Sequence, residues 1–157
     1  FARTMRHGLI PNLLDSGNKP RYNARDAVWF FLNAIREYIL FTNDTHILCH
    51  ELDMIFLDDD ITVHYQKLKN GEKRIMKLCE VIQYILQSHA YGINSREWNA
   101  GKEIDEHMRD EGFNIKIHFD KNTGFIYGGN SFNCGTWMDK MGSSEKARNK
   151  GIPATPR

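Results

Sequence analysis

The stretch TGFIYGGNSFNCGTWMDKMG (residues 123–142) combines aromatic residues, asparagines and glycines, and it contains one carboxylate, Asp139, two positions after Trp137. Aromatic rings pack on the apolar faces of a sugar ring, and amides such as Asn130 and Asn133 exchange hydrogen bonds with hydroxyl groups. A carboxyl group in a partly dry pocket can stay protonated near neutral pH and act as a general acid. The alternative interpretation is a glycine-rich loop with buried aromatic side chains and a surface aspartate.

The bulk composition fits a folded domain and favours no charged partner. The chain has 157 residues, of which 41% are hydrophobic, which suits one domain with a core. Its formal net charge is +1, from 21 basic and 20 acidic residues, so nothing favours nucleic acid or an anionic membrane as partner. No apolar run approaches the ~18 residues of a membrane span. No signal peptide is visible, although a chain that starts with Phe1 does not show a native N-terminus.

The three cysteines, Cys49, Cys79 and Cys134, are scattered and odd in number. No pair has the CxxC spacing of zinc or redox motifs, so we expect reduced thiols, no metal site and a cytoplasmic protein. Cys134 lies inside the glycine-rich stretch, either as a small buried side chain or as a pocket thiol.

Two segments have the periodicity of amphipathic helices. Residues 23–41 carry apolar side chains at spacings of three and four, with Asn23 as the expected N-cap. Residues 73–91 repeat this pattern and are followed by Gly92, which can stop a helix. We expect a third, short helix over residues 102–111.

A β-hairpin is expected over residues 113–127. Apolar and polar side chains alternate at the start of this segment, and residues 120–124 (DKNTG) are turn formers. The hairpin leads the chain into the glycine-rich stretch.

Arg25 and Asp26 stand near the start of the first expected helix. The structural interpretation of Asp26 is an acid in the first helical turn, where it favours the helix dipole. The functional interpretation is that both side chains point into a pocket and clamp neighbouring sugar hydroxyls, one as donor and one as acceptor. Trp29, one turn further on, is either an apolar wall of that pocket or a core residue.

Other polar clusters carry weaker signals. Residues 95–101 form either a capped turn with an exposed Arg96–Glu97 pair or a segment that brings Trp98 and Asn99 to a sugar. The acidic run at residues 58–60 is typical of a solvated loop. The histidines show no spacing of zinc ligands.

Five sequence blocks together resemble one enzyme family. The C-terminal glucosidase part of eukaryotic glycogen debranching enzymes contains blocks similar, in the same order, to RHGLIPNLL (residues 6–14), RYNARDAVW (21–29), DEGFNI (110–115), the 123–142 stretch and ARNKGIPATPR (147–157). No familiar block occurs in residues 42–73.

The resemblance implies an (α/α)6 barrel, in which six inner helices are ringed by six outer ones. Twelve helices of ~11 residues with connections of ~4 to 6 need about 200 residues. We therefore expect a mainly α fold, a fragment of an (α/α)6 barrel with a β-hairpin inserted before the catalytic loop. Residues 1–157 would form a partial glucosidase domain whose remainder lies beyond residue 157.

The resemblance also implies an activity, the inverting hydrolysis of the α-1,6-linked glucose at branch points of glycogen or branched limit dextrin. Such a reaction requires one acid and one base. The GTWMD match makes Asp139 the acid, and the base would lie beyond residue 157. No cofactor or metal is implied. The implied sugar contacts are Arg25, Asp26, Trp29, Trp98, Asn99, Asn130, Asn133 and Trp137.

Two other functions remain open on the sequence. The chain could be a catalytically silent fragment that binds glycans or contacts a subunit. It could also belong to a glucosidase of the same barrel type that acts on another glucoside. Release of free glucose from limit dextrin distinguishes these hypotheses.

Overall fold

The computed structural model of the chain describes residues 1–15, 19–55, 74–101, 103–137 and 141–153. These residues form two α-helices, three 3₁₀ helices and three small antiparallel sheets. The helical elements are α1 (Ala27–Thr42), α2 (Leu78–Tyr91), η1 (Ala2–Thr4), η2 (His46–Cys49) and η3 (Asp110–Phe113). The strands are β1 (Leu13–Asp15) paired with β2 (Lys19–Arg21), β3 (Glu51–Asp53) paired with β4 (Ile75–Lys77), and β5 (Ile93–Arg96), β6 (Asn114–Phe119) and β7 (Ile126–Tyr127) in one sheet.

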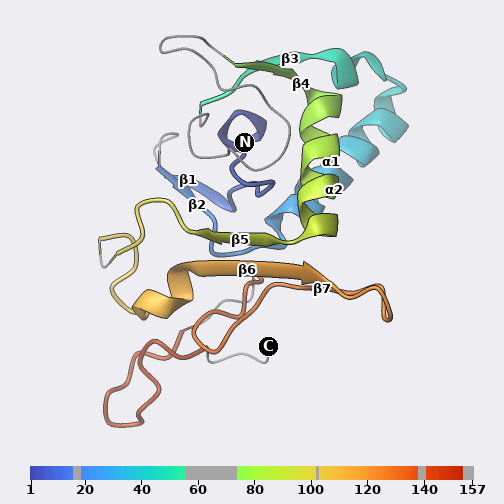
Figure 1. Cartoon of the computed structure of the whole chain (residues 1–157). Coiled ribbons are helices and arrows are strands. Elements are labelled where there is room, and N and C mark those ends of the chain that lie inside the picture. The colour runs from blue at the N-terminus through green and yellow to red at the C-terminus, as the bar shows by residue number, and fades with distance from the viewer. Residues whose placement is uncertain (16–18, 56–73, 102, 138–140, 154–157) are drawn as a thin grey trace.

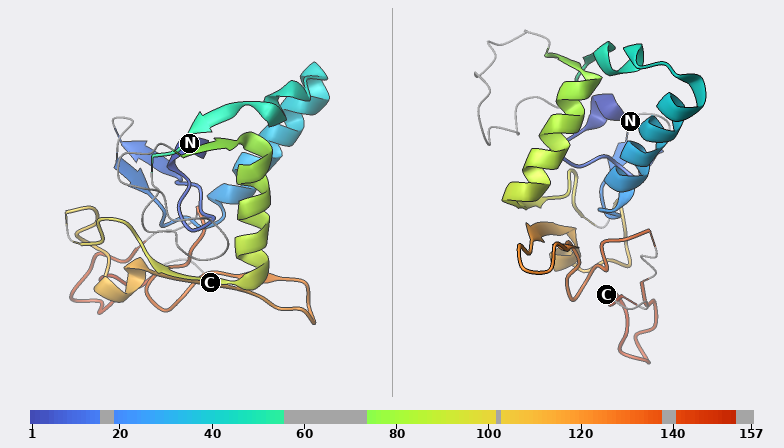
Figure 2. Two further views of the ribbon diagram at one scale, coloured as in Figure 1. Left: turned by 45° about the horizontal axis from the view of Figure 1, so that its top comes forward. Right: turned by 90° about the vertical axis from the view of Figure 1, so that its right-hand side faces the viewer.

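The sheet β5–β6–β7 separates two parts of the molecule. Both α-helices and the N-terminal segments lie above it in Figure 1, and the C-terminal segment lies below it. Two further views show the same arrangement (Figure 2). The central strand β6 pairs with β5 in a register that sets Ile93 opposite Ile117, and α2 contacts β6. The sheet therefore joins the helical part to the segment that carries the glycine-rich stretch.

The expectation of a mainly α-helical fragment of an (α/α)6 barrel is wrong, because the described residues hold two α-helices and three antiparallel sheets. One cause is visible at the helix expected over residues 102–111. There Asp105 Oδ1 accepts the backbone N–H groups of His107 (3.0 Å) and Met108 (3.2 Å). Such local side-chain bonds compete with a helical ladder, and among the described residues of this expected helix, 103–111, only the start of η3 is helical.

Helix α1 begins at Ala27 with Asp26 at the N-cap, three residues after Asn23, the N-cap that the sequence pattern suggested. The backbone N–H groups just before it are bonded elsewhere: that of Ala24 to Asn12 Oδ1 (3.3 Å) and that of Arg25 to the carbonyl of Gly135 (2.9 Å). Val28 is the one side chain of α1 that is fully buried. The wide buried stripe expected for this helix is therefore largely open in the described part of the chain.

Helix α2 begins at Leu78 because residues 75–77 pair with β3 as strand β4. The N–H of Lys77 donates to Glu80 Oε2 (2.6 Å), which satisfies one group at the helix start. Gly92, with φ of 95°, follows its end. The hairpin expected over residues 113–127 is present as β6 and β7.

Two hydrophobic clusters hold these elements together. One lies between α1, α2 and the N-terminal segment and includes Val28, Val81 and Ile85. The other lies on β5 and β6 and consists of Leu9, Tyr22, Ile93, Ile115 and Ile117, with Trp98 packed against it. Burial of such side chains stabilises a fold by about 1.5–3 kcal/mol each.

Candidate active site

A small cavity of about 100 Å³ lies where the start of α1, the end of α2, the sheet and the glycine-rich stretch meet. Three predicted site residues, Arg25, Asp26 and Trp29, line this cavity together with residues of the glycine-rich stretch. The lining residues are Arg25, Asp26, Trp29, His89, Ile117, Ile126, Gly128, Gly129, Cys134, Gly135 and Thr136.

Asp26 borders this cavity from the N-cap position of α1, but its side chain does not cap the helix. Instead, Oδ2 accepts the backbone N–H of Trp137 (3.1 Å). Its other oxygen, Oδ1, is buried and has no hydrogen-bond partner among the described residues. Asp26 thus stands at the start of α1, as the helix-dipole interpretation requires, and it also links this start to Trp137 of the glycine-rich stretch.

Arg25 is buried, with 4% of its surface exposed. Its guanidinium donates to the carbonyl of Gly128 (2.6 Å) from Nη1, and to those of Asn114 (3.0 Å) and Gly112 (3.5 Å) from Nη2. Burial lowers the pKa of Arg25 to about 10, against the raising effect of the Glu97 carboxylate, so the group stays charged at neutral pH. Arg25 therefore fastens β6 and the glycine-rich stretch to the start of α1.

The two asparagines of the glycine-rich stretch are also bonded to backbone. Asn130 and Asn133 form an isolated antiparallel bridge. Asn133 is fully buried, donates from Nδ2 to the carbonyl of Gly112 (3.1 Å) and accepts the N–H of Gly135 (2.8 Å). Asn130 donates to the carbonyl of Asn114 (3.2 Å). These amides shape the loop, and the bonds they make are to the protein.

Gly135 allows the close approach between this loop and Arg25. Its φ is 72°, and a Cβ atom there would lie 2.8 Å from Arg25 Nη1 and 3.0 Å from the carbonyl oxygen of Gly128. A side chain would strain the backbone and displace the guanidinium. The glycine is thus required by the hydrogen bonds of Arg25.

A second, larger cavity of about 490 Å³ lies on the other side of Asp26. Its surface is mostly apolar, and Trp137 on its border is 67% exposed. The lining residues are Phe1, Ala2, Ile10, Pro11, Asn12, Ala24, Asp26, Ala27, Phe30, Phe31 and Trp137. Its volume falls in the range typical of small-molecule sites, ~300–1,000 Å³. Asp26 therefore lines both the small cavity, whose surface is partly polar, and the larger, mostly apolar one.

His89 is a cavity residue that the sequence analysis did not select. It is 2% exposed, and its ring meets that of Trp29 edge-on, with centroids 5.0 Å apart. Its Nδ1 lies 2.9 Å from the carbonyl oxygen of Ile85, and burial lowers the pKa of the imidazole. Position 89 continues the buried stripe through positions 81 and 85 of α2, which was the signal available in the sequence.

Trp98 and Asn99 lie outside both cavities that Asp26 borders. Trp98 packs on the cluster around β5 and β6, and Asn99 is exposed with φ of 56°. The alternative interpretation of this segment, an exposed Arg96–Glu97 pair, is wrong. Glu97 is buried and accepts Arg21 Nε (2.7 Å), whereas Arg96 is exposed and pairs with Asp110.

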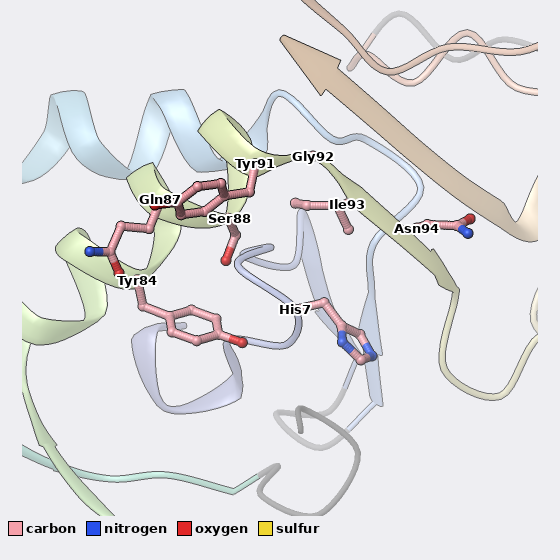
Figure 3. Close-up of a pocket in the computed structure, with 8 residues that line it drawn as sticks. All are labelled: His7, Tyr84, Gln87, Ser88, Tyr91, Gly92, Ile93 and Asn94. Atoms are coloured by element: carbon pink, nitrogen blue, oxygen red, sulfur yellow. The ribbon is translucent and has the colours of Figure 1, made fainter. Parts of the chain in front are cut away.

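A third cavity, of about 280 Å³, lies at the end of α2 and contains none of the predicted site residues. Figure 3 shows Tyr84 and Ser88 of α2 directed toward the N-terminal turn that carries His7. His7 and Gly8 both have positive φ, of 52° and 78°, and the N–H and carbonyl groups of Arg6 and Leu9 bond across this turn. The RHGL block thus encodes a tight turn packed on α2.

Asp139 and the acidic run at residues 58–60 lie outside the described residues. Within the described ranges, no group of three or more His, Cys, Asp or Glu side chains could hold a metal ion. Neither α-helix described above has the length and hydropathy of a membrane span. Cys49, Cys79 and Cys134 all lie within the described residues and form no disulfide, and Cys134 is the buried one.

The comparison with protein families gives the class of the chain. A family model described as amylo-alpha-1,6-glucosidase matches residues 1–157, and the chain therefore belongs to this family. It is similar to the glycogen debranching enzyme of Saccharomyces cerevisiae, with 51% identity over 158 residues. The match covers all of this chain and 10% of that relative, so the chain spans about a tenth of the relative's length. The resemblance noted in the sequence blocks is confirmed.

Proposed function

We propose that this chain is part of a glycoside hydrolase that releases glucose from α-1,6 branch points of glycogen or branched limit dextrin. Membership of the amylo-alpha-1,6-glucosidase family and the name of the yeast relative support this proposal. The observation that carries it is the bond from the N–H of Trp137 to Asp26 Oδ2. This bond joins Trp137 of the GTWMD motif to the start of α1, at Asp26, which lines both cavities.

In this proposal, Asp139 is the general acid of an inverting mechanism. It would protonate the oxygen of the leaving glucan chain, while a carboxylate base beyond residue 157 activates water. The exposed ring of Trp137 would pack against the sugar beside the acid. The substrate is an uncharged polymer, in keeping with the net charge of +1. A cytoplasmic location is part of the proposal and is supported by three cysteines that form no disulfide.

The remaining predicted residues take two kinds of role. Asp26 and Trp29 would contact the sugar directly, since Asp26 lines both cavities and Trp29 lines the small one. Arg25, Asn130 and Asn133 would hold the loop in place, since their described hydrogen bonds are to backbone groups. The sugar contacts predicted for Trp98 and Asn99 stay predictions, because these residues line neither cavity next to Asp26.

The test measures free glucose released from limit dextrin by the full-length polypeptide and its Asp139→Asn variant. Loss of a general acid should reduce this rate ~10²- to 10⁴-fold, with dextrin binding nearly unchanged. On α-glucosyl fluoride, whose leaving group hardly needs protonation, the variant should lose much less. Equal losses on both substrates would remove Asp139 from the acid role, and retention of dextrin without any glucose release would indicate a silent binding protein.

Asp26→Asn in the same assay tests the sugar contact at the start of α1. The amide oxygen can still accept the N–H of Trp137, so the loop should stay in place. A direct hydrogen bond from a sugar hydroxyl to the carboxylate is worth more than one to an amide, and we expect glucose release to fall roughly 10-fold. Full activity in this variant would exclude the contact.

A further inference from the structure

Three side chains that line the 100 Å³ cavity each have a buried polar atom without a hydrogen-bond partner among the described residues. These atoms are Arg25 Nε, Asp26 Oδ1 and His89 Nε2. A buried polar atom without a partner is costly, and most such atoms in proteins are satisfied. One donor and two acceptors around one cavity match the hydrogen-bonding capacity of a hydroxyl group, which both donates and accepts.

The protonation of His89 follows from its other nitrogen. Nδ1 lies 2.9 Å from the carbonyl oxygen of Ile85, which can only accept, so Nδ1 carries the proton. In the neutral ring, Nε2 is then an acceptor. Burial disfavours the imidazolium and lowers the pKa of His89, which keeps the ring neutral in the physiological range.

A sugar hydroxyl matches this arrangement. A hydroxyl group both donates and accepts, so it can donate to an imidazole nitrogen or carboxylate and accept from a guanidinium. The cavity is smaller than the ~300 Å³ typical of pockets that enclose a whole ligand. It suits one hydroxyl or hydroxymethyl edge of a glucosyl unit beside Trp29, whose ring contacts His89.

We propose that His89 is a sugar-binding residue whose Nε2 accepts a hydrogen bond from one hydroxyl group of the glucosyl unit bound at the start of α1. This inference rests on the proposed glucosidase function and adds to it a specificity-determining residue on α2. Arg25 and Asp26 lie in one of the five sequence blocks that resemble the family, whereas His89 lies outside all five.

The test uses two substitutions that each imitate one ring nitrogen. His89→Asn places an amide near Nδ1, where it can still donate to the carbonyl of Ile85. His89→Gln places an amide oxygen near Nε2, where it can still accept. His46→Asn, at an exposed position in η2, serves as the matched control.

Binding of glucose and of 2-, 3-, 4- and 6-deoxyglucose to the full-length polypeptide is measured by titration calorimetry, beside hydrolysis of limit dextrin. His89→Asn should weaken glucose binding about 3- to 10-fold, and His89→Gln should weaken it less. One deoxyglucose should bind the unsubstituted protein more weakly than glucose and lose nothing further in His89→Asn, as expected for a double-mutant cycle across one hydrogen bond.

The outcomes separate this inference from the proposed function. The inference is overturned if dextrin is hydrolysed but His89→Asn lowers the binding affinity of all four deoxyglucoses by the same factor. His89 would then be a packing residue or hold a structural water. If glucose binds with the expected coupling but dextrin is not hydrolysed, the inference stands and the proposed function falls. If neither glucose binding nor hydrolysis occurs, both are overturned.

Discussion

The two sides of the small cavity treat polar side chains in opposite ways. On the side of the glycine-rich stretch, Asn133 and the guanidinium ends of Arg25 are bonded to backbone carbonyls. On the helical side, Asp26 Oδ1 and His89 Nε2 are buried without partners among the described residues. Both sides carry polar side chains of the types that bind sugars. Those on the side of the glycine-rich stretch hold the loop, whereas those on the helical side have an atom available to a ligand.

The largest effect on the bonded side is expected from Arg25→Lys. Lysine keeps the charge but cannot donate from a planar fork to three carbonyls. We expect the opening free energy of the loop to fall by about 3 kcal/mol, from the loss of two charge-assisted hydrogen bonds. Amide hydrogen exchange of residues 126–135 in the full-length polypeptide measures this opening. Unchanged exchange with a large loss of glucose binding would instead make Arg25 a sugar clamp, as first predicted from the sequence.

A smaller effect is expected from Gly135→Ala, with Gly124→Ala as its matched control. Both glycines have positive φ, of 72° and 76°, but only Gly135 has neighbours within 4 Å of an added Cβ. Backbone strain alone costs ~1 kcal/mol at either position, and we expect roughly 2 kcal/mol at Gly135, where Arg25 must also shift. Equal changes in amide exchange for the two variants would show that the close approach of Gly135 to Arg25 does not contribute to the opening free energy of the loop.

The comparison also shows what the sequence could reveal. The periodicity of residues 73–91 and the alternation at 113–119 located α2 and the hairpin, because each pattern is local. The start of α1 could not be placed, because the backbone of Ala24 and Arg25 is bonded to distant residues. The barrel was expected from the family resemblance and not from a local pattern, and the described residues instead pair β3 with β4, β5 with β6 and β6 with β7.

The site was predictable only in part. The resemblance brought Arg25, Asp26 and Trp29 together with the 123–142 stretch, and the described part of that stretch does meet them. It did not reveal which polar atoms are already bonded. His89 looked like one more position on a buried helical stripe, and its missing partner on Nε2 exists only in three dimensions.

The smallest expected effect is the pH dependence that His89 gives to α2. Burial lowers the pKa of His89 in the folded protein below the ordinary value of 6.5. The unfolded state therefore binds more protons around and below pH 6.5, and folded-state stability is fully present above that pH and falls as the pH drops. Amide exchange of α2, corrected for intrinsic rates, should show this fall, and His89→Asn should remove it. If the pH dependence of exchange is unchanged in His89→Asn, groups other than His89 cause it. Asp26 and Arg25 are the other charged residues that line the same cavity.

The bonds of Arg25 also determine when this site can form during folding. Its guanidinium reaches carbonyls that are 87, 89 and 103 residues away in sequence, and Asp26 meets an N–H that is 111 residues away. Contacts between such distant residues form slowly, since the chain must lose loop entropy before they stabilise it. During synthesis, the start of α1 therefore acquires its final partners only after residues up to 137 have left the ribosome. Until then, the guanidinium of Arg25, which is buried in the folded protein, remains exposed to water.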